Sequence, residues 1–290
     1  MCTPMHLDVT STGQPISAFL RACAGRSIDL SGSGGGPSPL QVIPAQWRQL
    51  SGSLTKFAAE LPSIESSFEP EGDELVQSFR HTIYDAVELF DSYTALLPGK
   101  MSPKDAVEKR RLREYAATAK RLRDFAGKVC NRCKHNGAQL KFLWARSPVN
   151  GRTGARLLVS SYAEENALLR DDTIHKGRMA GMGLVRLGQQ LGHNLLRVDR
   201  AAGGLIEGWP DGDGLPLATI DPTLPVGPAL RLLADLRATR HADEAASHDG
   251  MVFEGDHIEL VRVGAESLGA NVSMRAKLTV EAGTTRYSVA

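Results

Sequence analysis

The residues best suited to chemistry lie together near the middle of the chain, where residues 129–136 read Val-Cys-Asn-Arg-Cys-Lys-His-Asn. Asn131 and His135 are four residues apart and therefore share one face of a helix, with Lys134 beside them. Histidine titrates near neutral pH and can move a proton to or from a ribose hydroxyl. Arg132 and Lys134 can stabilise the charge that develops on a phosphate. The set fits metal-free phosphodiester cleavage, with His135 as acid or base and Asn131 orienting a neighbour.

A structural interpretation of the same residues stays open, because Arg, Lys and His are favoured at a helix C-terminus by the helix dipole. The spacing Cys130-x-x-Cys133 also has a structural interpretation. A structural zinc site needs four ligands and the chain has no second such pair, while a redox pair would need a βαβ setting. We expect both cysteines to be small core residues, and we expect no metal and no cofactor.

Two long helices must position these residues. Each carries an apolar residue at every third or fourth position, which is the pattern of one buried helical face. The first stripe is Val76, Phe79, Ile83, Ala86, Phe90, Tyr93 and Leu97, and the second is Leu112, Tyr115, Ala119, Leu122, Ala126, Val129 and Cys133. Pro98-Gly99 ends the first helix, and Ser102-Pro103 is expected to start the second. The two stripes predict an antiparallel helix hairpin.

The remaining elements predict a mainly α fold, a helical bundle around this hairpin, with a β-hairpin insertion and a small C-terminal α+β segment. Residues 1–40 are expected to be a flexible segment, and residues 41–200 a bundle domain with a β-hairpin at 139–163, whose turn is Asn150-Gly151. A helix is expected over 44–61, ending at Pro62. Residues 201–228 read as a linker and residues 229–290 as the C-terminal segment. Gly177, Gly181, Gly188 and Gly192 suggest close helix packing.

Charge is segregated between the two arms of the hairpin. Residues 60–91 hold nine acidic residues against Arg80 alone, whereas residues 100–156 hold sixteen Lys or Arg against four acidic residues. The two arms are expected to neutralise each other in part, because opposite charges beside a helix seam favour its pairing. The positive surplus would then face a phosphate backbone. The candidate RNA-binding residues are Lys120, Arg123, Lys128, Lys141 and Arg146.

A helix hairpin whose second helix ends in Asn-Arg-x-Lys-His-Asn resembles the HEPN superfamily over roughly residues 44–136. The resemblance implies a small, usually dimeric helical bundle. Many such domains are metal-independent ribonucleases of toxin, antiphage or RNA-processing systems, and others are inactive binding or dimerisation modules. His135 matches the histidine of the family motif by its place, and Arg132 matches the arginine loosely, because only two residues separate them and the family has four to six.

A second stretch fits the family spacing more closely. Arg170, the polar Asp171 and His175 have four residues between the arginine and the histidine, although they follow the β-hairpin instead of ending a bundle helix. Three functions therefore stay open: an RNA-directed protein that acts as a ribonuclease, a non-catalytic helical adaptor, or a small-molecule or nucleotide sensor, which would need a pocket lined by the C-terminal strands. The expected partners are RNA and a second copy or another protein.

The composition sets the remaining expectations. The net charge of +1 excludes a global attraction to polyanions, so any RNA contact must be local. No apolar run reaches the ~20 residues that cross a bilayer, and the first residues lack the features of a signal peptide. Four cysteines are too few and too scattered for a disulfide scaffold, which favours a cytoplasmic protein.

Overall fold

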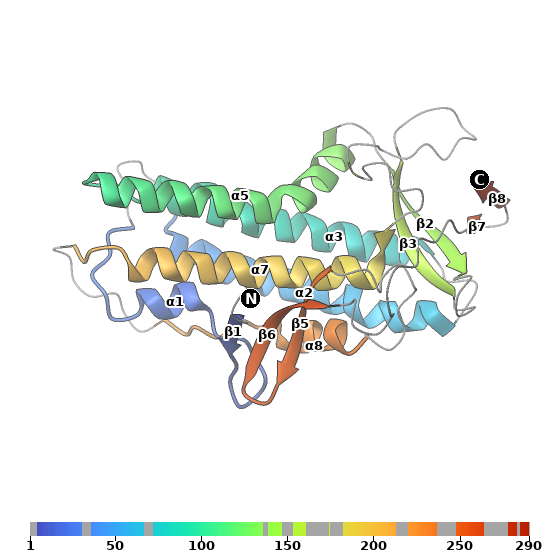
Figure 1. Cartoon of the computed structure of the whole chain (residues 1–290), viewed down its shortest axis with the longest axis horizontal. Helices are drawn as coiled ribbons and strands as arrows, with labels where there is room; N and C mark the ends of the chain where they lie inside the picture. The colour runs from blue at the N-terminus through green and yellow to red at the C-terminus, as the bar shows by residue number, and fades with distance from the viewer. Residues whose placement is uncertain are drawn as a thin grey trace, which may run out of the picture.

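The computed structural model describes residues 5–30, 36–66, 72–135, 139–146, 153–160, 174, 182–212, 220–236, 248–263, 278–282 and 285–289. Long helices lie side by side and two antiparallel sheets flank them (Figure 1), which confirms the mainly α fold. The helices are α1 (Ala18–Cys23), α2 (Pro39–Ser66), α3 (Gly72–Asp91), the π-helix η1 (Ser92–Leu96), α4 (Leu97–Gly99), α5 (Ala106–His135), α7 (Leu184–Glu207) and α8 (Gly227–Asp235). The strands are β1 (Met5–Asp8), β2 (Gln139–Arg146), β3 (Thr153–Ser160), β4 (Met182–Gly183), β5 (His248–Glu254), β6 (His257–Val263), β7 (Leu278–Ala282) and β8 (Thr285–Val289).

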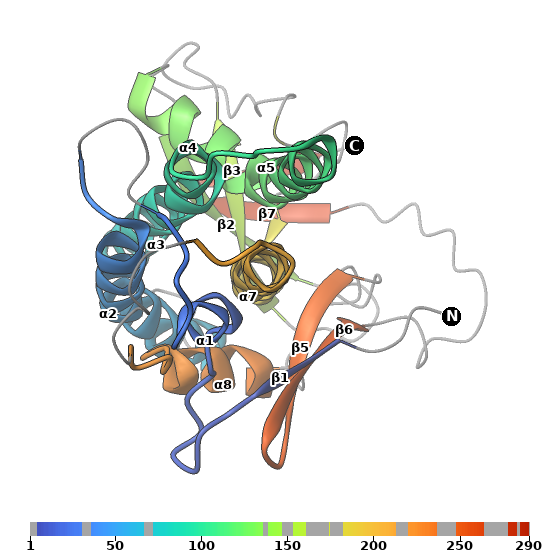
Figure 2. The same ribbon diagram turned by 90° about the vertical axis from the view of Figure 1, so that its left-hand side faces the viewer.

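Helix α7 is the central element of the bundle. The end-on view of Figure 2 shows it with α1, α3, α5, α8 and β5 around it, and all five contact it. Sixteen of its 24 residues are buried, because the elements packed around it cover most of its surface. A Cβ on Gly188 would lie 2.8 Å from Leu233, and one on Gly192 would lie 2.5 Å from Met251. This confirms the close packing predicted for these two glycines; Gly177 and Gly181 lie outside the described residues.

The predicted helix hairpin is present, formed by α3 and α5 with η1 and α4 between them. The apolar stripes face the core, and their fully or nearly fully buried members are Phe79, Ile83, Ala86, Phe90, Tyr93 and Leu97 on one arm and Tyr115, Ala119, Leu122, Ala126 and Val129 on the other. Helix α2 packs along α3 and adds Trp47, Leu54 and Phe57 to the same core. Hydrophobic periodicity alone was therefore sufficient to find the hairpin.

Three helix boundaries differ from the prediction, the first being the start of α2, which lies at Pro39 rather than at Pro44. Helix α5 begins at Ala106 rather than at Ser102-Pro103, because Asp105 Oδ1 accepts hydrogen bonds from the backbone N–H groups of residues 107 and 108, each at 2.8 Å. Glu108 Oε2 accepts from the backbone N–H of Lys104 at 2.6 Å, which completes a reciprocal cap. Helix α2 continues through Pro62 to Ser66, since one missing backbone hydrogen bond does not outweigh its packing on α3.

Residues 5–30 are ordered by pairing and packing, although the sequence predicted a flexible segment over residues 1–40; residues 1–4 and 31–35 lie outside the described part. Strand β1 pairs with β6, from Met5 opposite Leu260 onwards, and α1 packs on α7 with Phe19 and Cys23 fully buried. The predicted linker also differs, because α7 extends to Glu207 and residues 223–224 pair with the N-terminal segment. These pairings join distant parts of the chain, so local sequence patterns do not predict them.

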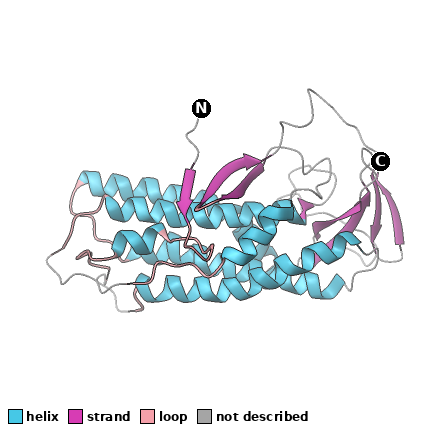
Figure 3. Cartoon of the chain, turned by 90° about the horizontal axis from the view of Figure 1, so that it is seen from below, coloured by secondary structure: helices cyan, strands magenta, loops and turns pink. Residues whose placement is uncertain are grey.

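The C-terminal strands belong to two different sheets rather than to one separate segment over 229–290. Strands β5 and β6 form the order β1-β6-β5, while β7 and β8 extend the predicted hairpin into the order β4-β3-β2-β7-β8. The hairpin itself is confirmed, with Gln139 opposite Ser160 and Arg146 opposite Thr153. Figure 3 shows the larger sheet at one end of the long helices and the smaller sheet along their side.

Candidate nucleic-acid interface

Helix α5 carries most of the residues that the sequence singled out. It holds ten Lys or Arg and three Asp or Glu, a net charge of +7, over a length of about 45 Å. Figure 2 shows it at the outside of the bundle, so one long face is turned away from α3 and α7. The chemistry of this helix therefore depends on which of its cations are exposed and which already have a carboxylate.

The polar cluster at the end of α5 is spread around the helix. Asn131 and His135 are exposed on one face, as their spacing predicted, and Arg132 is half-buried. The Lys134 ammonium lies 4.5 Å from the ring centroid of Tyr84 on α3, a cation–π contact that points it toward the acidic arm. Asn131 and His135 are therefore brought together, while Lys134 turns toward the other arm.

Two of the predicted RNA-binding residues are engaged within the protein. The Arg123 guanidinium makes a two-point ion pair with Asp91 at the end of α3, at 2.5 Å and 3.2 Å. Lys128 lies 2.6 Å from Asp124, one turn earlier on the same helix. The expected partial neutralisation of the two arms is thus present at Arg123. Lys120, the third candidate on α5, is exposed.

The remaining predicted residues are only partly covered by the structure. Lys141 and Arg146 lie in β2, where backbone pairing places them opposite Leu158 and Thr153; their side chains are outside the described part. The second candidate motif, Arg170, Asp171 and His175, also lies outside the described residues.

An exposed basic face was not assigned from the sequence. It consists of Lys109, Arg113, Lys120 and Arg121, all exposed and none in an ion pair with any described residue. The spacings of four and seven put the first three in one row, and Arg121 widens it to about a third of the helix circumference. The same row continues past Asp124, which is paired with Lys128, to Asn131 and His135. The spacing of these residues is visible in the sequence. It places Asn131 and His135 of the polar cluster on the same side of α5 as the basic face.

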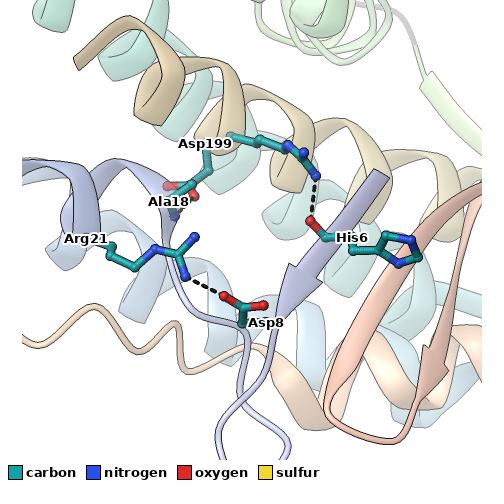
Figure 4. Close-up of polar contacts among 6 residues, drawn as sticks. His6, Asp8, Ala18, Arg21 and Asp199 are labelled. Carbon is teal, nitrogen blue, oxygen red and sulfur yellow. Dashed lines mark hydrogen bonds and ion pairs between the residues drawn. The ribbon is translucent and has the colours of Figure 1, made fainter. Parts of the chain in front are cut away.

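A buried carboxylate holds the bundle beneath this face, and the sequence analysis missed it. Asp199 on α7 is fully buried and accepts hydrogen bonds from Ser17 Oγ at 2.6 Å, the Ala18 N–H at 2.7 Å and the Tyr93 hydroxyl at 2.7 Å. Figure 4 shows Asp199 above Ala18, the first residue of α1, and the ion pair between Arg21 of α1 and Asp8. The signal was an aspartate within an apolar stripe, between Leu195 and Ala202.

This network extends to α2 and α5 through Tyr93. Trp47 Nε1 donates to the Tyr93 hydroxyl at 3.1 Å, and the Tyr115 hydroxyl donates to the Tyr93 backbone carbonyl at 2.8 Å. Burial raises the pKa of Asp199 above its ordinary value, although the hydrogen bonds from Ser17 and Tyr93 oppose that shift. One carboxylate thus connects α1, η1 and α7, and through Tyr93 it fixes α5.

No protein-family model, no curated protein and no solved structure matches this chain. The structure also contains, within its described ranges, no helix with the length and apolar character that crossing a bilayer requires.

Proposed function

We propose that this protein binds RNA through the basic face of α5, defined by Lys109, Arg113, Lys120 and Arg121. The observation that carries the proposal is that these four cations are exposed and have no carboxylate partner among the described residues, while Arg123 and Lys128 of the same helix do. Cations of this kind bind a phosphate backbone because binding releases its condensed counterions. The resemblance of the sequence over residues 44–136 to the HEPN superfamily, many members of which act on RNA, favours RNA over other polyanions.

The direct experiment measures binding of a fluorescently labelled, mixed-sequence single-stranded RNA by anisotropy at low salt. Neutralising Lys120→Gln and Arg121→Gln together is expected to weaken binding about tenfold, since each exposed ionic contact contributes up to ~1 kcal/mol. Arg48→Gln is the matched control, because Arg48 is exposed on α2 and lies outside the basic face. Circular dichroism checks that every variant keeps its helix content.

Three results would contradict the proposal in different ways. An equal loss of RNA affinity in the Arg48→Gln control would show that the basic face is not the binding surface. Equal affinity for duplex DNA of the same length would make the target any polyanion. Absence of RNA binding would leave a helical adaptor that docks a protein partner as the better account.

A second candidate function is metal-independent RNA cleavage at the end of the same row. The observation that favours it is that Asn131 and His135 are exposed together on one face of α5. In this mechanism the ribose 2′-hydroxyl loses its proton and attacks the adjacent phosphate, which forms a 2′,3′-cyclic phosphate and breaks the bond to the 5′-oxygen of the next nucleotide. His135 moves a proton from the attacking hydroxyl or to the leaving oxygen, and Arg132 stabilises the charge on the phosphate. Lys134 lies against Tyr84 and would have to leave that ring to contribute.

Cleavage of a labelled RNA pool in EDTA separates catalysis from binding. The native protein is compared with His135→Ala and with His175→Ala, which tests the second sequence motif. Activity lost only with His135→Ala would assign the centre to the end of α5, and loss only with His175→Ala would assign it to the other motif. Binding without cleavage by any of the three would leave an RNA-binding protein without this activity.

A further inference from the structure

A surface hollow lies far from α5, between the loop that follows β1, the helix α8 and the turn between β5 and β6. Its volume is about 390 Å³, and its lining includes Thr10, Ser11, Thr12, Arg231 and Asp256. The hollow thus combines one guanidinium, three hydroxyl groups and one carboxylate, and its volume is within the size range of ligand sites. Figure 1 shows the loop after β1 and the β5–β6 turn on the side of the bundle opposite α5.

The guanidinium of Arg231 is stacked on an aromatic ring. Its guanidinium carbon lies 4.6 Å from the ring centroid of Phe253, and that ring packs against the core. Arg231 donates no hydrogen bond to any residue that the structure describes, so its N–H fork is available. A guanidinium fixed by stacking loses little conformational entropy when it binds an anion at two points.

The hydroxyl groups sit on a rigid turn beside this guanidinium. The turn closes through the hydrogen bonds Thr10 N–H to Gln14 O and Gly13 N–H to Thr10 O, each at 2.8 Å, and Gly13 has the positive φ of 75° that this geometry needs. Gln14 Oε1 accepts from the Gly227 N–H at 2.9 Å, which ties the turn to α8. A Cβ on Gly13 would lie 3.3 Å from Arg231 Nη2, so the guanidinium lies directly against the turn.

We propose that this hollow binds a hydroxylated phosphate monoester, such as a sugar phosphate. The Arg231 fork and the hydroxyl of Ser11 donate to the phosphate oxygens. The Thr12 hydroxyl lies 2.8 Å from Thr10 Oγ1, and it donates to the phosphate as well when Thr10 is the donor of that bond. Asp256 binds the hydroxyl groups of the organic part as an acceptor. The Asp256 carboxylate would repel a bare phosphate. A ligand that carries hydroxyl groups as well as a phosphate therefore fits this lining better than inorganic phosphate does.

The position of Asp256 supports that role. His257 Nδ1 lies 3.1 Å from its carboxylate, and this hydrogen bond lowers the pKa of Asp256, so it is an anion and an acceptor at neutral pH. The backbone carbonyl of Asp256 also accepts from the Val9 N–H at 2.8 Å, which fixes the β5–β6 turn against the loop after β1. All three walls of the hollow are therefore joined to one another before a ligand arrives.

Isothermal titration calorimetry with ribose 5-phosphate at constant ionic strength tests the proposal. The native protein is expected to show saturable binding at one site, weakened roughly tenfold or more by Arg231→Gln, because the lost contacts are hydrogen bonds to a charged group. Ser11→Ala, which removes one exposed hydroxyl and leaves the fold intact, is expected to weaken binding to a smaller degree. Arg48→Gln on α2 is the control and should bind as the native protein does.

The amide signals of Gly13 and Gly255 report the place of binding in a two-dimensional NMR titration with the same ligand, and both are expected to shift. The native protein is expected to bind inorganic phosphate more weakly than ribose 5-phosphate. The Asp256→Asn variant is expected to bind the two ligands with equal affinity. The proposal is overturned by non-saturable heats, by unchanged affinity in Arg231→Gln, or by tighter binding of inorganic phosphate to the native protein.

Discussion

The Tyr93 hydroxyl lies 2.7 Å from Asp199 Oδ1, so the π-helix that follows the acidic arm is hydrogen-bonded to the central helix α7. The same tyrosine accepts from Tyr115 of α5 through its backbone carbonyl. The basic face of α5 is therefore positioned by buried polar contacts as well as by its apolar stripe. Polar contacts of this kind fix the rotation of a helix, which a smooth apolar stripe leaves less determined.

Replacing Tyr93 with phenylalanine tests that network. The change removes a donor to Asp199 and the acceptor of Trp47 Nε1, and it should lower the free energy of unfolding by about 1–3 kcal/mol. Urea denaturation measures the effect. Tyr84→Phe is the control, since the Tyr84 hydroxyl donates no hydrogen bond to a described residue, and it should cost less than about 0.5 kcal/mol. Equal losses in the two variants would contradict the role of the Tyr93 hydroxyl.

The pH dependence of stability follows from Asp199. Burial raises its pKa above 3.8, so the folded protein keeps a proton that the unfolded chain has already released. The stabilising contribution of this group is fully present below pH 3.8 and is lost as the pH rises through the folded-state pKa. Chemical denaturation measures the free energy of unfolding of the native protein and of Asp199→Asn. The stability of the native protein relative to the variant should increase as the pH falls from neutral. Movement in the opposite direction would mean that the hydrogen bonds outweigh burial.

The helix hairpin of α3 and α5 and the β-hairpin of β2 and β3 were predictable because each depends on local spacing. The stripe from Phe79 to Leu97 has a helical period, and Asn150-Gly151 between two apolar runs is a turn signal. The N-terminal segment could not be predicted in the same way. Ser17 and Ala18 are ordered by Asp199, which is about 180 residues away in sequence, and a window of local residues contains no trace of such a contact.

The common face of Asn131 and His135 was predicted from the sequence, whereas the ion pairs of the cations were not. Asn131 and His135 share the face that a four-residue spacing requires. Arg123 was grouped with the RNA-binding cations because of its charge, whereas its guanidinium is engaged by Asp91 on the neighbouring arm. Which cations of a basic helix are available depends on the rotation of that helix against its partner, and rotation becomes visible only in the folded structure.

Adjacent glycines on α7 give opposite predictions for the α1–α7 contact. A Cβ on Gly203 would lie 2.7 Å from the backbone of Ala18, so Gly203→Ala should lower the free energy of unfolding by about 2 kcal/mol. A Cβ on Gly204 meets nothing within 4 Å, so Gly204→Ala should raise stability by up to about 1 kcal/mol through helix propensity. Thermal denaturation of both variants measures the pair. Destabilisation by the two to the same extent would contradict the close approach of α1 to α7.

The cysteines of the folded core should resist alkylation. Burial raises the pKa of Cys23 to about 12 and that of Cys133 to about 11, and it also raises the pKa of Cys130. The thiolate is the reactive form, so iodoacetamide at pH 8 should leave all three unmodified in the native protein and modify them after denaturation. Peptide mass spectrometry resolves each site. Rapid labelling of Cys130 or Cys133 in the native protein would restore a redox interpretation of the pair.

The salt dependence of RNA binding tests the central claim most directly, because it counts phosphate contacts. For single strands the logarithm of the association constant falls with the logarithm of salt concentration at about 0.7 per phosphate contact. We predict that Lys120→Gln with Arg121→Gln makes this slope shallower by about 1.4, the equivalent of two contacts, while Arg48→Gln leaves it unchanged. A slope in the double variant equal to that of the native protein would show that RNA does not contact the basic face of α5.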